Sequence, residues 1–237
     1  MVSLKGQTAV VTGTSSGIGR AIALELAKAG VELYLVGRNR ARLEPVALAA
    51  QELGAEAVCQ VLDLTDDAPV RGFAAALAGS FDILVHSAGV IALAPLSQAA
   101  LADFDSQYRV NLRAPFLLTQ ALLPAIKEAR GQIVFINSGA GLRANAGWGH
   151  YAATKHGLKA LADSLREEVS PDGVRVLSVF PGRTASPMQE AVHRTEGRTY
   201  QPERLVQPVD VAEQVVAALR LPRRAGVTDL SIRPGTL

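Results

Sequence analysis

The chain has 237 residues, of which 24 are basic and 22 acidic, giving a net charge of +2. So small a surplus gives no electrostatic reason to expect a nucleic acid or an anionic membrane as partner. Hydrophobic residues make up 49% and charged residues 19%, which is typical of one globular α/β domain and excludes a largely disordered chain.

The sequence has no feature that predicts export or membrane insertion. Met1 is followed almost at once by a strand-like run, which is unlike a signal peptide. The longest apolar stretch, residues 116–126, is interrupted by polar residues and Pro124, and is too short to span a bilayer. The single cysteine, Cys59, cannot form an intrachain disulfide. We therefore expect a cytoplasmic protein.

Short β-branched runs alternate with longer helical patterns along the chain. Strands are expected at residues 8–12, 33–36, 57–61, 83–85, 133–136, 174–179 and 229–232. These runs are mostly apolar, as strands buried on both faces are. Helices are expected at residues 18–29, 151–169 and 101–129, the last with room for two. The alternation predicts a single-domain, Rossmann-type, doubly wound sheet of seven mainly parallel strands, with helices on both faces.

Two segments do not follow this alternation. Pro45 is unfavourable within a helix that begins near Arg40, and we expect it to mark the true first turn of that helix. Residues between Pro181 and Pro208 show no periodicity, and so long an irregular segment in a compact domain usually has a function. We expect residues 183–207 to form a lid over the substrate.

A glycine-rich motif follows the first strand and opens the first helix: Thr12-Gly13-Thr14-Ser15-Ser16-Gly17-Ile18-Gly19. Its glycines allow the backbone to turn sharply and approach a pyrophosphate, and the helix N-terminus offers free N–H groups. The spacing G-x-x-x-G-x-G differs from the general dinucleotide fingerprint G-x-G-x-x-G. A glycine-rich tight turn without a ligand is the alternative, but the position between strand and helix favours a dinucleotide.

The end of the second strand bears on the choice of nucleotide. It has the sequence Val36-Gly37-Arg38-Asn39-Arg40, without the carboxylate that usually binds the 2′-hydroxyl of NAD. Arg38 can offer a bidentate guanidinium to the 2′-phosphate of NADP. Two solvated arginines are the alternative. We expect NADP(H) to be preferred, with NAD(H) still possible.

Tyr151 and Lys155 are four residues apart, so on a helix they share a face. Hydride transfer to a carbonyl leaves an oxygen that needs a proton, and a tyrosine can supply it. Its pKa is normally about 10, and a nearby ammonium group lowers it. In isolation this spacing is also found on many solvated helix faces.

Taken together, these motifs resemble the short-chain dehydrogenase/reductase family, and in the family's order. The glycine motif, Ser138 after a strand, and Tyr151-x-x-x-Lys155 carry the resemblance, which covers essentially the whole chain. Further matches follow strands or lie in a helix: Asp63, Ala88-Gly89, Asn111 and Pro181-Gly182. The resemblance implies an oxidoreductase that moves a hydride between a nicotinamide cofactor and a carbonyl or alcohol.

The resemblance also implies roles for four catalytic residues. Tyr151 would be the acid/base, and Lys155 would hold the nicotinamide ribose and lower the pKa of Tyr151. Ser138 would hydrogen-bond the substrate oxygen. Asn111 would hold a water molecule that links Lys155 to solvent.

The residues that the resemblance assigns to cofactor binding span the chain, and no metal is expected. Asp63 and Leu64 would contact adenine, and Thr184 and Ser186 the nicotinamide carboxamide. The full set is Gly13, Ser15, Ser16, Gly17, Ile18, Gly19, Arg38, Asp63, Leu64, Ser87, Ala88, Gly89, Tyr151, Lys155, Pro181, Gly182, Thr184 and Ser186.

The sequence departs from the family pattern at two places. His86-Ser87 stands where the family often has Asn-Asn, and the Ser87 side chain is shorter than that of asparagine. We expect His86 to be a buried core histidine. Ser186 stands where the family often has threonine, a change that keeps the hydroxyl.

The substrate, the partners and one alternative function remain open at this level. The pocket walls are expected from residues 90–96, 139–150 and 183–207, whose arginines are either solvated or meet an anionic substrate. The family acts on small-molecule carbonyls and alcohols of many kinds, so the fold does not name the substrate. By the same resemblance we expect a homodimer or homotetramer. The alternative function is a non-catalytic, redox-responsive regulator that binds NADP(H). An epimerase or dehydratase of the broader fold would need a larger substrate domain.

Overall fold

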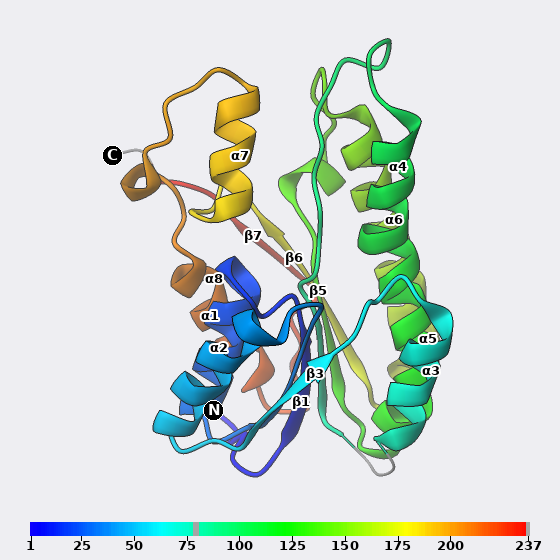
Figure 1. The fold of residues 1–237 in the computed structure, drawn as a ribbon. Helices are drawn as coiled ribbons and strands as arrows, with labels where there is room; N and C mark the ends of the chain where they lie inside the picture. The colour runs from blue at the N-terminus through cyan, green and yellow to red at the C-terminus, as the bar shows by residue number, and fades with distance from the viewer. Residues whose placement is uncertain (78–80, 236–237) are drawn as a thin grey trace.

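The computed structural model describes residues 1–77 and 81–235, which form one parallel sheet covered by helices on both faces (Figure 1). Every strand pairing is parallel, and the order is β3-β2-β1-β4-β5-β6-β7. The strands are β1 (Thr8–Thr12), β2 (Glu32–Gly37), β3 (Ala57–Val61), β4 (Ile83–His86), β5 (Gln132–Ile136), β6 (Arg175–Pro181) and β7 (Asp229–Ile232). The predicted seven-stranded, doubly wound sheet is confirmed.

The helices form two layers. They are α1 (Gly17–Lys28), α2 (Arg40–Glu52), α3 (Asp67–Ala76), α4 (Leu101–Tyr108), α5 (Ala114–Glu128), α6 (Gly149–Val169), α7 (Pro187–Thr195) and α8 (Pro208–Leu219). Figure 1 shows α1, α2 and α8 on one side of the sheet and α3 to α6 on the other. None of the helices in the described part of the chain is long and apolar enough to cross a membrane.

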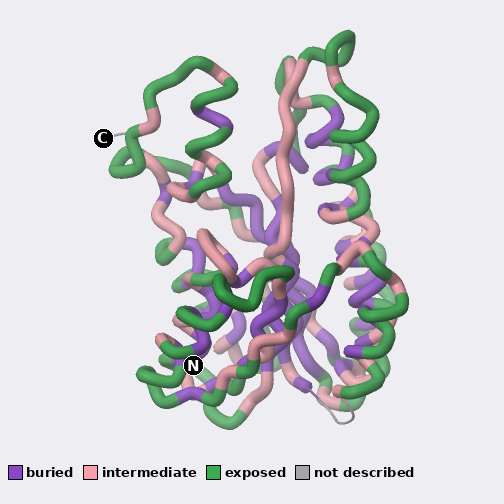
Figure 2. Tube along the Cα trace, viewed as in Figure 1, coloured by how far each residue is buried: buried purple, intermediate pink, exposed green. Residues whose placement is uncertain are grey.

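Each layer buries its own apolar cluster against the sheet. Ile22, Leu26 and Val215 belong to the cluster under α1 and α8, whereas Leu118 and Leu158 belong to the opposite one. Figure 2 shows the resulting buried centre, which runs along the strands. Burial of two apolar faces is the main stabilising contribution to such a fold and fixes the strand edges in place.

The strand order reverses between β1 and β4, and the loops that follow these two strands touch. Gly13 has a φ of +70°, and a Cβ atom there would lie 2.7 Å from Ala88 Cα. Only glycine fits both the backbone conformation and the contact. In doubly wound sheets, ligands bind beyond the carboxyl ends of the strands at such a reversal.

The prediction for Pro45 is wrong. Helix α2 begins at Arg40, and Pro45 lies inside it rather than in its first turn. The proline forfeits one backbone hydrogen bond. Leu43, Val46 and Ala50 of this helix are nevertheless buried, and their burial holds the helix on the sheet.

The segment between Pro181 and Pro208 is more regular than its sequence suggests. It contains α7 and a short 3-10 turn, Pro202–Arg204. Ser186 caps α7, since its Oγ accepts a hydrogen bond from Gln189 N at 3.1 Å, and Pro187 occupies the first helical position. This Ser-Pro signal is visible in the sequence, but the helix is too short for its periodicity to stand out.

Candidate active site

A cavity of about 600 Å³ opens along the carboxyl edge of the sheet, a volume in the range of ligand-binding pockets. All the residues predicted to contact the cofactor line this cavity, and so does Ser138. Asn111 does not line it. The fold therefore brings the predicted residues to one place, from segments as far apart as Gly13 and Ser186.

The N-terminus of α1 forms the wall nearest β1. Its N-cap, Ser16, makes no side-chain cap hydrogen bond, and the first turn contains no acidic residue. The first backbone N–H groups of α1 therefore have no side-chain acceptor, and the residues that carry them line the cavity. A Cβ on Gly19 would lie 2.4 Å from Gly13 O, so this turn must be glycine. The arrangement fits a pyrophosphate.

Arg38 and Asp63 line another part of the same cavity. Asp63 Oδ1 accepts hydrogen bonds from Thr65 N at 2.9 Å and Thr65 Oγ1 at 2.8 Å. These bonds, with a smaller contribution from the Arg38 guanidinium, lower the pKa of Asp63. This part of the cavity therefore offers an ionised acceptor and an exposed cation, which fit an adenosine that carries a phosphate.

His86 and Ser87, which stand where the family often has Asn-Asn, make contacts that hold the end of β4 in place. His86 is buried, with Nε2 2.8 Å from Thr119 Oγ1 and its ring stacked on Phe135. Burial lowers the pKa of His86 to about 3, so it is a neutral core residue, as predicted. Thr12 Oγ1 accepts hydrogen bonds from the backbone N–H groups of Ser87 and Ala88, and these bonds join the ends of β1 and β4.

Ser138 follows β5 and caps the 3-10 turn Gly139–Gly141. Its Oγ accepts a hydrogen bond from Ala140 N at 3.1 Å, and its backbone N–H donates to Asn137 Oδ1 at 2.8 Å. Since Oγ already accepts a bond, the hydroxyl proton is directed elsewhere. Ser138 can therefore donate to a substrate oxygen in the cavity.

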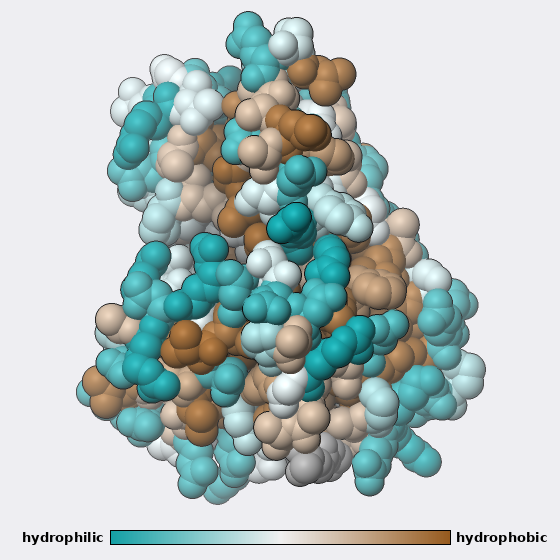
Figure 3. All heavy atoms as spheres, turned by 45° about the vertical axis from the view of Figure 1, so that its right-hand side comes forward, coloured by the Kyte–Doolittle hydropathy of each residue, from teal (hydrophilic) through white to brown (hydrophobic). Residues whose placement is uncertain are grey.

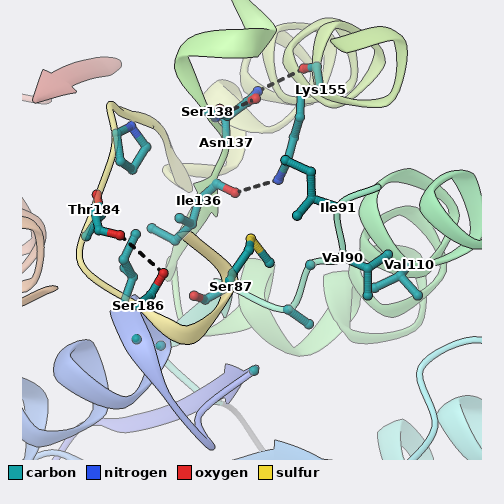
Figure 4. A pocket seen from close by; sticks show the side chains of 18 of the residues that line it. Ser87, Val90, Ile91, Val110, Ile136, Asn137, Ser138, Lys155, Thr184 and Ser186 are labelled. Carbon is teal, nitrogen blue, oxygen red and sulfur yellow. Dashed lines mark hydrogen bonds between the residues drawn. The ribbon is translucent and has the colours of Figure 1, made fainter. Parts of the chain in front are cut away.

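Lys155 lies one helical turn after Tyr151 on α6, and both side chains are buried. The Lys155 Nζ donates to Ile136 O at 3.1 Å (Figure 4) and is 6.0 Å from the centroid of the Tyr151 ring. Burial lowers the pKa of Lys155 to about 8.

The pKa of Tyr151 differs from the expectation. Burial raises it to about 12, and a hydrogen bond with Ser138 opposes this only in part. The lowering expected from Lys155 is not found in the protein chain alone, because burial of the phenol dominates. Tyr151 is thus a protonated acid at neutral pH, the form that donates a proton to a carbonyl oxygen.

Asn111 lies behind the cavity on a π-helical turn, Arg109–Arg113, between α4 and α5. Its Oδ1 accepts from Val90 N at 2.9 Å, and its Nδ2 donates to Val90 O at 2.9 Å and Thr154 Oγ1 at 3.2 Å. Such turns are frequent at functional sites. The side chain is committed to protein partners, and the water relay remains a prediction.

Asn137 was not predicted. Its Nδ2 donates to Lys155 O at 3.0 Å, and its Oδ1 accepts from Ser138 N (Figure 4). One amide thus links the end of β5 to α6 and fixes Ser138 relative to Lys155. The signal was a polar residue directly after a buried strand, adjacent to Ser138.

The opposite wall comes from α7 and from the loop before α6. The Trp148 ring packs edge-on against Tyr151, with centroids 6.0 Å apart, and Arg183 Cζ lies 5.8 Å from the Trp148 ring. Arg183, Trp148 and Met188 all line the cavity, as does Arg233, which was not predicted. The wall is therefore partly apolar and partly cationic.

The comparison with known proteins decides the family. Residues 7–197 match the model of the short chain dehydrogenases. The chain belongs to the short-chain dehydrogenase/reductase family. An uncharacterized oxidoreductase of Staphylococcus epidermidis is 33% identical over 238 residues, covering 99% of this chain and 100% of the relative.

Solved structures of this family superpose over almost the whole chain. An alcohol dehydrogenase from Thermococcus sibiricus, in complex with 5-hydroxy-NADP, has a TM-score of 0.88 at 29% identity and covers 96% of each chain. A short-chain dehydrogenase from Burkholderia cenocepacia, in complex with NADP, has a TM-score of 0.88 at 31% identity and covers 98% of each chain. The protein thus has the fold of family members that bind nicotinamide dinucleotides.

Proposed function

We propose that this protein is an NADP(H)-dependent oxidoreductase that interconverts a carbonyl and an alcohol, with Tyr151 as the acid/base. The observation that carries the proposal is that Ser138, Tyr151 and Lys155 line one cavity, with Lys155 one helical turn after Tyr151 on α6. NADP(H) is preferred because Arg38 lines the cavity where a carboxylate would select NAD. The NADP-type ligands of the Thermococcus and Burkholderia structures support this preference.

When bound, the nicotinamide supplies the hydride for reduction or accepts it in oxidation. Ser138 holds the substrate oxygen by donating its hydroxyl proton. Tyr151 gives its proton to that oxygen in the reductive direction and takes it back in the oxidative direction. Lys155, with a pKa near 8, contributes a positive charge that stabilises the phenolate left on Tyr151.

The site favours an enzyme over a non-catalytic regulator that binds the same cofactor. A regulator needs the glycine turn and Arg38 but has no use for a buried acid beside a hydroxyl donor. Here Asn137 holds both Ser138 and the Lys155 backbone in place, which a binding protein would not require. A regulator would bind NADPH without turning over any substrate, and a turnover assay distinguishes the two functions.

The test follows NADPH absorbance with a panel of ketones, aldehydes and diketones for the wild type and Tyr151→Phe. We expect the substitution to lower kcat by roughly 10²- to 10⁴-fold. NADPH binding, followed by fluorescence of Trp148, the only tryptophan, should persist. Tyr34→Phe is the matched control, since Tyr34 packs on Phe73 away from the cavity. Equal turnover by wild type and Tyr151→Phe would remove Tyr151 from the mechanism, and tight NADPH binding without turnover across the panel would favour the regulator.

Residues 183–207 are part of the same proposal as a substrate lid. Thr184, Met188 and Val192 line the cavity from this segment, and the last two belong to α7. An inserted proteolytic site in the exposed turn at Gly197 should be cut more slowly when NADPH and substrate are present.

A homodimer or homotetramer is also proposed, with α4 and α5 at the interface. Leu101, Phe104, Tyr108 and Phe116 repeat at helical spacing along these two helices and are all exposed. Figure 3, which turns this side of the molecule forward, shows apolar side chains gathered among polar ones. Sedimentation equilibrium of the wild type and Phe104→Glu tests this assembly, and a monomeric wild type would contradict the proposal.

A cytoplasmic location, which the single free cysteine fits, completes the proposal.

A further inference from the structure

The last strand brings an arginine to the substrate part of the cavity that the proposed mechanism does not use. Arg233 follows the end of β7 and lines the cavity together with Ser138 and Tyr151. Because β7 pairs with β6 in parallel, its carboxyl end reaches the same edge of the sheet as the catalytic loops.

Two glycines make room for this side chain. A Cβ on Gly182 would lie 3.4 Å from Arg233 Cδ, so the aliphatic part of the arginine passes over the loop after β6. A Cβ on Gly139 would lie 2.5 Å from Arg233 Nη1 and 3.2 Å from Cζ, so the guanidinium rests on the residue that follows Ser138. Any larger residue at position 139 would displace it. The positive charge of this exposed arginine therefore lies against the residue that follows Ser138, at the edge of the cavity.

Most of the hydrogen-bonding capacity of this guanidinium is unused within the described residues. Arginine has five N–H donors, and Arg233 makes one long hydrogen bond, from Nη1 to Phe180 O at 3.5 Å. No carboxylate of residues 1–77 or 81–235 forms an ion pair with it. Arg183, in the same wall, is by contrast bound to both carboxylate oxygens of Glu196.

We propose that Arg233 binds a carboxylate of the substrate, so that the enzyme reduces oxo acids or oxidises the corresponding hydroxy acids. The inference rests on the proposed function and adds the substrate class. In the reductive direction the carbon–oxygen π bond breaks, a hydride from NADPH forms the new C–H bond, and Tyr151 protonates the oxygen. NADPH is oxidised to NADP⁺, and the carboxylate takes no part beyond its contact with Arg233.

A carboxylate suits this position better than any group of the cofactor. The planar guanidinium donates two parallel N–H bonds to the two oxygens of a carboxylate. The charged groups of NADP(H) have other candidate partners, namely the N-terminus of α1 and Arg38. The nicotinamide carboxamide is neutral and has hydroxyl-bearing neighbours in Thr184 and Ser186. The phosphates and the carboxamide of NADP(H) thus have candidate partners elsewhere in the cavity, which leaves Arg233 for an anionic group of the substrate.

The experiment compares oxo acids with their methyl esters, which have the same carbonyl but no charge. Pyruvate, acetoacetate and levulinate place the carboxylate at increasing distance from the carbonyl carbon. We expect the wild type to prefer at least one acid over its ester in kcat/KM, and Arg233→Ala to lower that acid-to-ester ratio by roughly 10- to 100-fold. Arg233→Lys should retain part of the preference. Arg223→Ala is the matched control, since Arg223 is exposed and outside the cavity.

Binding is measured separately, so that failure of this inference is distinguishable from failure of the proposed function. The same acids and esters are titrated against the NADP⁺-loaded protein, with Trp148 fluorescence as the readout, whether or not turnover occurs. Tighter binding of an acid than of its ester, weakened by Arg233→Ala, supports the carboxylate site even in a catalytically silent protein.

Three outcomes overturn the inference. Equal or better use of every ester, with no acid bound more tightly, would show that no carboxylate is recognised. A loss of acid preference in Arg143→Ala but not in Arg233→Ala would assign recognition to Arg143, which also lines the cavity. A weaker NADPH affinity in Arg233→Ala, with the acid-to-ester ratio unchanged, would assign Arg233 to the cofactor.

Discussion

The Arg183 side chain joins the end of β6 to the end of α7 through Glu196, with Nη2 2.8 and 2.7 Å from the two carboxylate oxygens. Arg183 also lies over the ring of Trp148, which packs against Tyr151. A continuous row of contacts therefore runs from the proposed acid to the proposed lid. The ion pair is only partly exposed, so it is more than a solvated surface pair.

Glu196→Gln should loosen α7 and raise KM for the substrate by roughly two- to fivefold, with a smaller change in kcat. The hydrogen bond from Arg183 lowers the pKa of Glu196, so the ion pair persists down to pH values below the ordinary 4.5 and is lost as the pH falls through the lowered pKa. Initial rates at pH 7 test the prediction. Glu190→Gln, on the exposed side of α7, is the control. If Glu196→Gln has the same KM as the control Glu190→Gln, the lid does not depend on Glu196.

Arg38→Ala should weaken NADPH binding by roughly 10- to 100-fold while the affinity for NADH changes little, because only NADPH carries the 2′-phosphate. Quenching of Trp148 fluorescence gives both dissociation constants. Arg42→Ala is the control, since Arg42 is exposed and outside the cavity. An unchanged NADPH-to-NADH affinity ratio in Arg38→Ala would mean that NADP(H) preference has another origin.

The sequence predicts most of this site because its motifs are local. Thr8–Thr12, Ala57–Val61 and Asp229–Ile232 are strands with the predicted bounds, since short apolar runs between turns have few other solutions. Once the strands are parallel, every residue that directly follows one comes to the same edge. Gly13 and Ser138 therefore line the same cavity, although they are 125 positions apart in the sequence (138 − 13 = 125).

What the sequence could not predict depends on packing between distant segments. Arg233 reaches the site only because β7 pairs with β6 and because Gly139 and Gly182 leave room. The pKa of Tyr151 depends on how deeply the phenol is buried, which spacing to Lys155 does not reveal. Pro45 shows the same limit, since tertiary burial of α2 outweighs a local helix-breaking preference.

Lys155→Met should flatten the pH dependence of stability in the alkaline range. Burial lowers the pKa of Lys155 from 10.5 to about 8, so between these values the unfolded chain binds more protons than the folded one. The free energy of unfolding of the wild type therefore gains a contribution as the pH rises through this range, of up to about 3 kcal/mol. Methionine is unbranched and only one atom shorter than lysine, and it has no amine to titrate.

Urea unfolding followed by circular dichroism at pH 7, 8, 9 and 10 checks this expectation. The informative quantity is the difference in the free energy of unfolding between wild type and variant, plotted against pH. The contributions of the other titrating groups cancel in this difference. Lys159→Met is the control, since Lys159 lies on the same helix but is paired with Asp163 near the surface. A Lys155→Met variant whose stability parallels that of the wild type across this range would show that Lys155 is not perturbed by burial.

Asn111→Ala should lower the free energy of unfolding by about 1 to 3 kcal/mol, because it leaves both backbone groups of Val90 without their partner. Asn39→Ala is the control, since Asn39 occupies an N-cap but makes no side-chain cap hydrogen bond. Urea unfolding at pH 7 gives both values. Since Val90 begins one wall of the cavity, Asn111→Ala should also raise KM for the substrate. If Asn111→Ala lowers kcat at unchanged stability and KM, its role is in proton transfer, as the water relay predicts, rather than in holding Val90.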